Sequence, residues 1–249
     1  MEIPKPEHTG ITFERNYGSR HIELPDGRTV TSMSDPSWDE FAMSFIDLEV
    51  QGGPGDYIIT PELITSAEFA PADTAESMYV VHERTRFAQR LTTLYPETTL
   101  LLGTAVIDPA YAKPRNAILF LQNGQEVGRT YKTPTLNRAE GLAFHQPEYP
   151  QLARPEPGIM PIICSDLVNN PQVDARVHTL LVSACWGAPA GHPGVLASPE
   201  HRHLQLLAGI TADLFASNAG LRTIVMADRV PPTGISASPF NFVARPSAR

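Results

Sequence analysis

Six short apolar runs constrain the fold of this chain more than any other feature. They are YIIT, TLLLGTAV, NAILFL, IMPIIC, TLLVSA and TIVMA, which begin at residues 57, 99, 116, 159, 179 and 223. Apolar runs of about four to eight residues without polar alternation are typical of strands buried on both faces. Because segments of helical periodicity lie between them, the sequence predicts an α/β fold whose sheets are covered on both sides.

The segments between these runs contain helix and turn signals. Asp26-Gly27 separates two short alternating runs within residues 20–31, which predicts a hairpin. A helix is predicted to open at Asp35-Pro36-Ser37, and two others over 74–94 and near 200–215. With no repeat and no clear linker, we expect one domain over 1–249.

Composition excludes several classes of function. The net charge of −8 and the pI near 5.5 argue against nucleic acid or an anionic membrane as a partner. No apolar stretch approaches the ~18 residues of a membrane span. The polar segment MEIPKPEHTG lacks the apolar core of a signal peptide, and the two cysteines, Cys164 and Cys185, suit a reducing compartment. We therefore expect a cytoplasmic protein.

Three of the strand-like segments end in a reactive side chain. Glu62 follows YIIT and Pro61, Lys132 ends EVGRTYK, and Cys164 ends IMPIIC. Taken singly, each has an ordinary explanation: a solvated loop carboxylate, an exposed strand-end lysine, and an inert buried thiol. Taken together, a carboxylate, an ammonium and a thiol are the groups needed for acyl transfer through a thioester.

The order and context of these residues, TPEL, then YK, then ICSD, resemble the nitrilase superfamily of carbon–nitrogen hydrolases, whose site is a Glu-Lys-Cys triad. The resemblance covers about 56–228. It implies a four-layer α-β-β-α sandwich that forms a homodimer or a higher homo-oligomer, with no metal or cofactor. It is weaker at both ends. We find no first strand of the family's VAxxQ type, so residues 1–35 are interpreted as an atypical N-terminal segment, and the chain stops soon after SASPFNF, where relatives commonly add strands.

The resemblance also implies a role for each site residue. Glu62 takes the proton of the Cys164 thiol, gives it to the leaving amine and then activates water, while Lys132 and the backbone N–H of Ser165 stabilise the oxyanion. Glu140 follows Lys132 at an offset suited to orienting the lysine. The turn after Cys164 could also lower the pKa of its thiol through backbone N–H groups and a helix dipole.

Two further residues concern the substrate pocket. Ser165 stands where relatives usually carry an aromatic residue, so the packing of such a ring against the substrate is lost. Trp186 suits a pocket wall and suits a core or interface position equally well. Cys185, directly before it, is interpreted as pocket wall rather than as the nucleophile.

Three functions are compatible with this sequence. The first is a thiol amidase that hydrolyses a non-peptide carbon–nitrogen bond of a small amide. The second is an amide-forming acyltransferase with the same triad, which passes the acyl group to an amine instead of water. The third is a catalytically silent nitrilase-like subunit used for binding or assembly. A small-molecule amide is the partner expected for the first.

Overall fold

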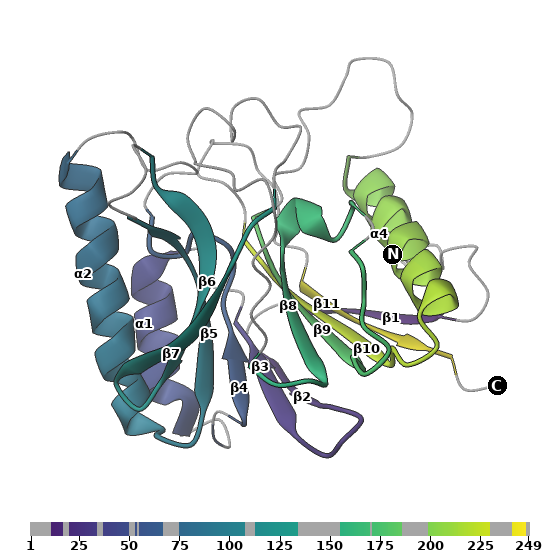
Figure 1. Ribbon diagram of the computed structural model, residues 1–249, viewed down its shortest axis with the longest axis horizontal. Coiled ribbons are helices and arrows are strands. Elements are labelled where there is room, and N and C mark those ends of the chain that lie inside the picture. Colours follow the sequence, from purple (N-terminus) through teal and green to yellow (C-terminus); the bar gives the residue numbers. More distant parts are fainter. Residues whose placement is uncertain are drawn as a thin grey trace.

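The structure is a computed structural model, and it describes most of the chain. The described residues are 11–16, 20–33, 37–49, 53, 55–66, 75–107, 113–133, 155–169, 171–185, 199–229 and 241–247. Within them, two β-sheets lie face to face (Figure 1). The first sheet has the strand order β2 (Arg20–Glu23), β3 (Thr29–Ser32), β4 (Tyr57–Ile59), β5 (Thr99–Val106), β6 (Arg115–Gln122) and β7 (Gln125–Tyr131). The second has the order β1 (Ile11–Asn16), β11 (Asn241–Pro246), β10 (Thr223–Asp228), β9 (Thr179–Ala184) and β8 (Ile159–Ile163).

Helices cover the outer faces of the two sheets. On one side are α1 (Trp38–Ile46) and α2 (Ala75–Leu91), and on the other is α4 (Pro199–Ser217) (Figure 1). Three short 3-10 helices are η1 (Asp47–Glu49), η2 (Thr92–Leu94) and η3 (Cys164–Asp166). This mixed α/β fold, with two sheets and helices, agrees with the fold class expected from the sequence. No helix in the described part of the chain combines the length and the apolar character that crossing a membrane requires.

Two hydrophobic clusters hold the layers together. One joins the facing sides of the sheets and continues to α4, with Ile59, Ile118, Ile162 and Val182 among its fully buried members. The other lies between the first sheet and its helices. Its buried members include Phe41, Phe45, Ala88, Leu91, Ile58, Leu100 and Leu102. The uninterrupted apolar runs follow from this burial, because each central strand has a covered layer on both faces.

Local signals placed several elements correctly. Ser37 caps α1: its hydroxyl accepts a hydrogen bond from the backbone N–H of Glu40 at 3.2 Å and donates to the Glu40 carboxylate at 2.7 Å. Asn123 and Gly124 have φ values of 45° and 75°, as the turn between β6 and β7 requires. Asp35 and Pro36, the other residues of the predicted helix start, lie outside the described residues.

Both ends of the chain depart from the sequence-based expectation. The hairpin strand β3 pairs with β2 and also, in parallel, with β4, so the hairpin belongs to the first sheet. The next helix along the chain is α1. β1 and β11 pair with each other, and β11 also pairs with β10. Neither β1 nor β11 was predicted from the sequence, and β11 begins at Asn241, within SASPFNF. These strands are short and rich in polar residues, so their pairing depends on tertiary contacts rather than on a local apolar run.

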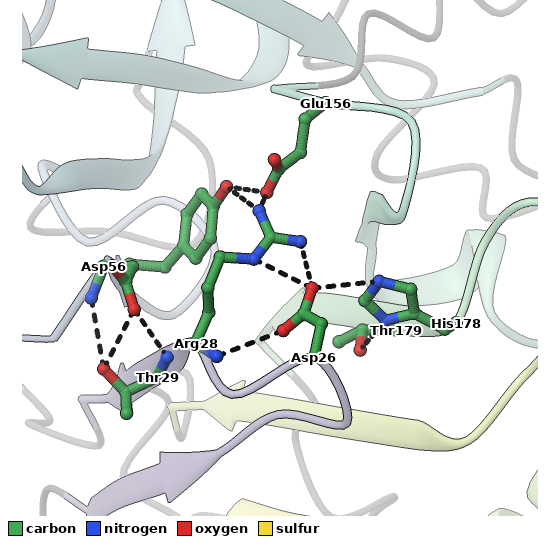
Figure 2. A network of polar contacts seen from close by, with 8 residues as sticks. Asp26, Arg28, Thr29, Asp56, Glu156, His178 and Thr179 are labelled. Carbon is green, nitrogen blue, oxygen red and sulfur yellow. Dashed lines mark hydrogen bonds and ion pairs between the residues drawn. The ribbon is translucent and has the colours of Figure 1, made fainter.

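A network of charged side chains joins the two sheets at the end where β4 and β8 begin (Figure 2). Arg28 forms ion pairs with Asp26 of its own turn and with Glu156, which precedes β8. Tyr57, the first residue of β4, also hydrogen-bonds to Glu156, and Asp26 lies 3.1 Å from the ring nitrogen Nε2 of His178. This network fixes the sheets at the end opposite to Glu62 and Cys164, which follow the same two strands.

Candidate active site

The three reactive side chains lie at one edge of the two sheets. Glu62 follows β4, Lys132 comes directly after β7, and Cys164 comes directly after β8. β8, β9 and β10 are parallel, and Ile163 is paired with Ser183 in β9, so their carboxyl ends lie side by side. This is the edge at which open α/β sheets bind their ligands.

The carboxylate of Glu62 lies at the centre of the site. Its Oε1 accepts hydrogen bonds from Lys132 Nζ at 2.7 Å and from Asn116 Nδ2 at 2.6 Å, and its Oε2 accepts one from the backbone N–H of Cys185 at 3.1 Å. Glu62 is only 1% exposed and Lys132 only 5%. A buried ion pair with this many directed hydrogen bonds fixes the orientation of the carboxylate.

Cys164 lies close enough to this carboxylate for the negative charge of Glu62 to act on its thiol. The residue is 6% exposed. The φ of Cys164 is +43°, in the left-handed region that residues other than glycine rarely adopt. Such strain at the junction of a buried strand and a helical turn is a feature of functional sites, where it aims one side chain out of the strand direction.

The ionisation of Cys164 differs from the sequence-based expectation. Burial, and then the negative charge of Glu62, raise the pKa of the Cys164 thiol well above its ordinary value, while Lys132 and the Cys185 N–H act in the opposite direction. The expectation that the following turn lowers this pKa is therefore wrong in its net direction. The turn is only the three-residue η3, too short to supply a useful helix dipole. The resting group is therefore a neutral thiol beside the Glu62 carboxylate.

A glycine in β5 allows the Glu62 segment to approach the sheet. A Cβ atom added to Gly103 would lie 2.9 Å from the Cα of Glu62 and would collide with the carbonyl oxygen of Pro61. The same glycine accepts a backbone hydrogen bond from Ile64 at 3.0 Å. The position of Glu62 therefore depends on a residue without a side chain at position 103.

Gly103→Ala should lower turnover by about 10²-fold, because the backbone that carries Glu62 must move by a fraction of an ångström or more. The measurement is kcat in the amide assay proposed below, with thermal unfolding recorded in parallel. Gly128→Ala in β7 is the matched control, since its Cβ would also be crowded, but by the ring of Phe120 at 2.8 Å rather than by the Glu62 segment. We expect the control to keep turnover within about threefold of wild type. Equal losses in both variants would contradict this role of Gly103.

Asp166 links the segments that carry Lys132 and Cys164. Its carboxylate accepts hydrogen bonds from the backbone N–H of Thr133, at 3.2 Å to Oδ2, and from the Thr133 hydroxyl. Burial raises the pKa of Asp166 to about 6, against the opposing effects of these hydrogen bonds and of the Lys132 charge. Thr133 directly follows Lys132, so this contact fixes the lysine relative to η3.

The raised pKa of Asp166 makes a prediction about stability. The folded protein holds the proton of Asp166 more tightly than the unfolded chain does. Its contribution to the free energy of unfolding is therefore fully present below about pH 4 and is lost as the pH rises through about 6. Asp166→Asn lacks this titrating group. As the pH rises from about 4 to about 7, we therefore expect the free energy of unfolding to fall by about 2 kcal/mol more in the wild type than in the variant. Denaturant titrations of both proteins at about pH 4 and about pH 7 measure it. Parallel pH dependence in both proteins would contradict it.

The other predicted site residues have different outcomes. Ser165 lies beside Cys164 in η3, and its hydroxyl is buried without a hydrogen-bond partner among the described residues. Glu140 and Trp186 lie outside the described residues, so their roles stay predictions. Sequence reasoning missed Asn116, although a polar residue at the start of the apolar run NAILFL was a usable signal.

Comparison with known proteins agrees with this architecture. No family model matches the chain, and no curated protein is similar to it in sequence. Among solved structures, the fold is similar to a carbon–nitrogen hydrolase from Helicobacter pylori G27, with a TM-score of 0.61 and 14% identity over 84% of this chain and 76% of that one. It is also similar to a mutant of an amidase of the nitrilase superfamily from Nesterenkonia AN1, with a TM-score of 0.59 and 14% identity over 98% and 92% of the two chains.

This chain has the nitrilase-superfamily fold. A further solved structure of similar fold is the glutamine-dependent NAD+ synthetase from Acinetobacter baumannii, with a TM-score of 0.55 and 18% identity. The match covers 93% of this chain but only 40% of that one. At such low sequence identity, similarity to these solved structures establishes only the architecture of this chain. Its chemistry has to be argued from the residues of the site.

Proposed function

We propose that this protein is a thiol amidase of the nitrilase superfamily, which hydrolyses the carbon–nitrogen bond of a small amide. One observation carries the proposal: the buried Glu62 carboxylate is hydrogen-bonded to the Lys132 ammonium and lies within electrostatic reach of the Cys164 thiol, which follows β8. A scaffold without catalysis has no need to bury an ion pair beside a thiol held in a left-handed conformation, since both are costly.

The proposed reaction has two halves. In the first, Cys164 Sγ bonds to the amide carbon as its proton passes to Glu62, and the carbon–nitrogen bond then breaks as Glu62 gives that proton to the leaving amine. In the second, Glu62 takes a proton from water as the water oxygen bonds to the thioester carbon. The carbon–sulfur bond then breaks as Glu62 returns that proton to Cys164 Sγ, which releases the carboxylic acid and restores the free thiol. In both halves Lys132 and the backbone N–H of Ser165 stabilise the oxyanion.

The neighbouring structures support a small aliphatic amide as substrate. One mutant of the amidase from Nesterenkonia sp. AN1 shows covalent addition of the acetamide moiety of fluoroacetamide at the active site cysteine. Another mutant of that amidase is in complex with acrylamide. By analogy, we propose that the substrate of this chain is an amide of similar size, which a neutral thiol activated by a carboxylate could attack.

Ammonia release from a panel of small amides tests this function. We expect turnover of at least one amide, and loss of that turnover in Cys164→Ala. Repeating the assay with hydroxylamine separates hydrolysis from acyl transfer, because an acyltransferase would divert most product to the hydroxamate. No turnover of any amide, together with an unreactive Cys164, would contradict the proposal and favour a silent binding or assembly subunit.

A further inference from the structure

The segment that carries Glu62 is a strained turn. Leu63, the next residue, has a φ of 54°, in the left-handed region. The turn is closed by a hydrogen bond from Ser66 N–H to the Leu63 carbonyl at 2.9 Å. Because Leu63 is not a glycine, this conformation is unfavourable by itself and needs support from surrounding groups.

Arg229 supplies such support from the second sheet. It directly follows β10 and is only 4% exposed. Its Nη1 donates to the carbonyl of Leu63 at 2.7 Å and to that of Ser66 at 3.2 Å. A planar guanidinium suits this task, since one nitrogen can donate to two carbonyl oxygens at fixed angles.

The backbone of Arg229 is tied to the same place. Its N–H donates to the carbonyl oxygen of Ala184 at 3.2 Å, and the N–H of Glu62 donates to that same oxygen at 3.1 Å. Burial lowers the pKa of Arg229, while the neighbouring Cys185 and Glu62 act in the opposite direction. A buried guanidinium is costly in free energy, and here it is placed within the electrostatic reach of the Glu62 carboxylate.

We propose that Arg229 is a positioning residue that fixes the turn at Leu63 and so holds the Glu62 carboxylate between Lys132 and Cys164. This inference rests on the amidase function proposed above. Arg229 acts through the backbone of the turn and does not touch the reacting atoms. Its loss should therefore slow the proton transfers that Glu62 performs, with little effect on the binding of substrate.

Arg229→Met tests the inference, with Arg222→Met as the matched control. Arg222 directly precedes β10, at the end opposite to Arg229, and its Nη1 likewise donates to two backbone carbonyls, those of Ala219 at 2.5 Å and Leu221 at 3.1 Å. We expect Arg229→Met to lower kcat by about 10²-fold with KM within about threefold of wild type. Alkylation of Cys164 by iodoacetamide should slow to a similar extent, and the control should change neither rate by more than about threefold.

A purely structural role is excluded by a second variant. Arg229→Lys keeps the charge and one donor to Leu63, so we expect it to recover about tenfold of the loss in both rates. Thermal unfolding measures whether the variants are folded at the assay temperature. If Arg229→Met does not fold, the two rates of Arg229→Lys test the role of Arg229 instead. Wild-type alkylation and kcat in the folded variants would overturn the role of Arg229 alone. Slow alkylation of the wild-type protein itself would overturn the proposed function and this inference together.

Discussion

Cys164→Ala is expected to lower amide turnover by about 10⁴-fold or more while leaving the fold intact. The thiol is the atom that bonds to the substrate, so no other side chain of the site can replace it. Alanine removes only one sulfur and adopts the left-handed φ of +43° no less easily than cysteine. The measurement is kcat/KM for the best amide, with circular dichroism and thermal unfolding to show that structure is retained.

Cys185→Ala is the control for this result. Cys185 contacts Glu62 through its backbone N–H, which alanine keeps, and burial raises the pKa of its thiol above the ordinary value. We expect this variant to retain more than about a tenth of wild-type turnover. If Cys164→Ala kept substantial turnover and Cys185→Ala lost it, the nucleophile would be Cys185 and the assignment of Cys164 would be wrong.

Glu62→Gln is expected to lower turnover by about 10³-fold and to slow alkylation of Cys164 as well. A glutamine cannot take the thiol proton. Its NH2 group would also face a donor in either orientation of the amide, because Cys185 N–H donates to one carboxylate oxygen and Lys132 Nζ donates to the other. The change also removes a buried ion pair, that of Glu62 with Lys132, which should cost about 3–5 kcal/mol of stability.

Alkylation rates and denaturant unfolding measure both effects of the Glu62 substitution. The matched control is Glu126→Gln in β7, where a glutamate forms an ion pair with Arg129 at a far more exposed position. Removal of this exposed ion pair should change the free energy of unfolding by less than about 1 kcal/mol. It should leave amide turnover and the alkylation of Cys164 unaffected. Normal alkylation of Cys164 in Glu62→Gln would remove the role of Glu62 as the base.

Most of the fold could be predicted because its central strands are locally encoded. Apolar runs such as TLLLGTAV and TLLVSA became β5 and β9 over the predicted residues. The position of Cys164 followed, since it directly ends the apolar run IMPIIC, and Lys132 directly ends the strand-like segment EVGRTYK. Burial on both faces leaves a signal in a single segment, without knowledge of what covers it.

The remaining features depend on contacts between distant segments. The pairing of β1 with β11 joins the two ends of the chain and leaves no apolar run in either. The hydrogen bonds of Asn116 and Arg229 around Glu62 arise only when the two sheets pack. The net direction of the pKa shift of Cys164 likewise depends on burial beside Glu62, which local turn chemistry does not reveal.

The central claim is that Glu62 activates Cys164, and intact-mass spectrometry after brief iodoacetamide treatment at neutral pH tests it most directly. The alkylated peptide is then identified. Although the pKa of the resting thiol is raised, Glu62 can take its proton as the sulfur attacks, so the account predicts one rapid addition at Cys164 that spares Cys185. Slow labelling, or equal labelling of both cysteines, would contradict it.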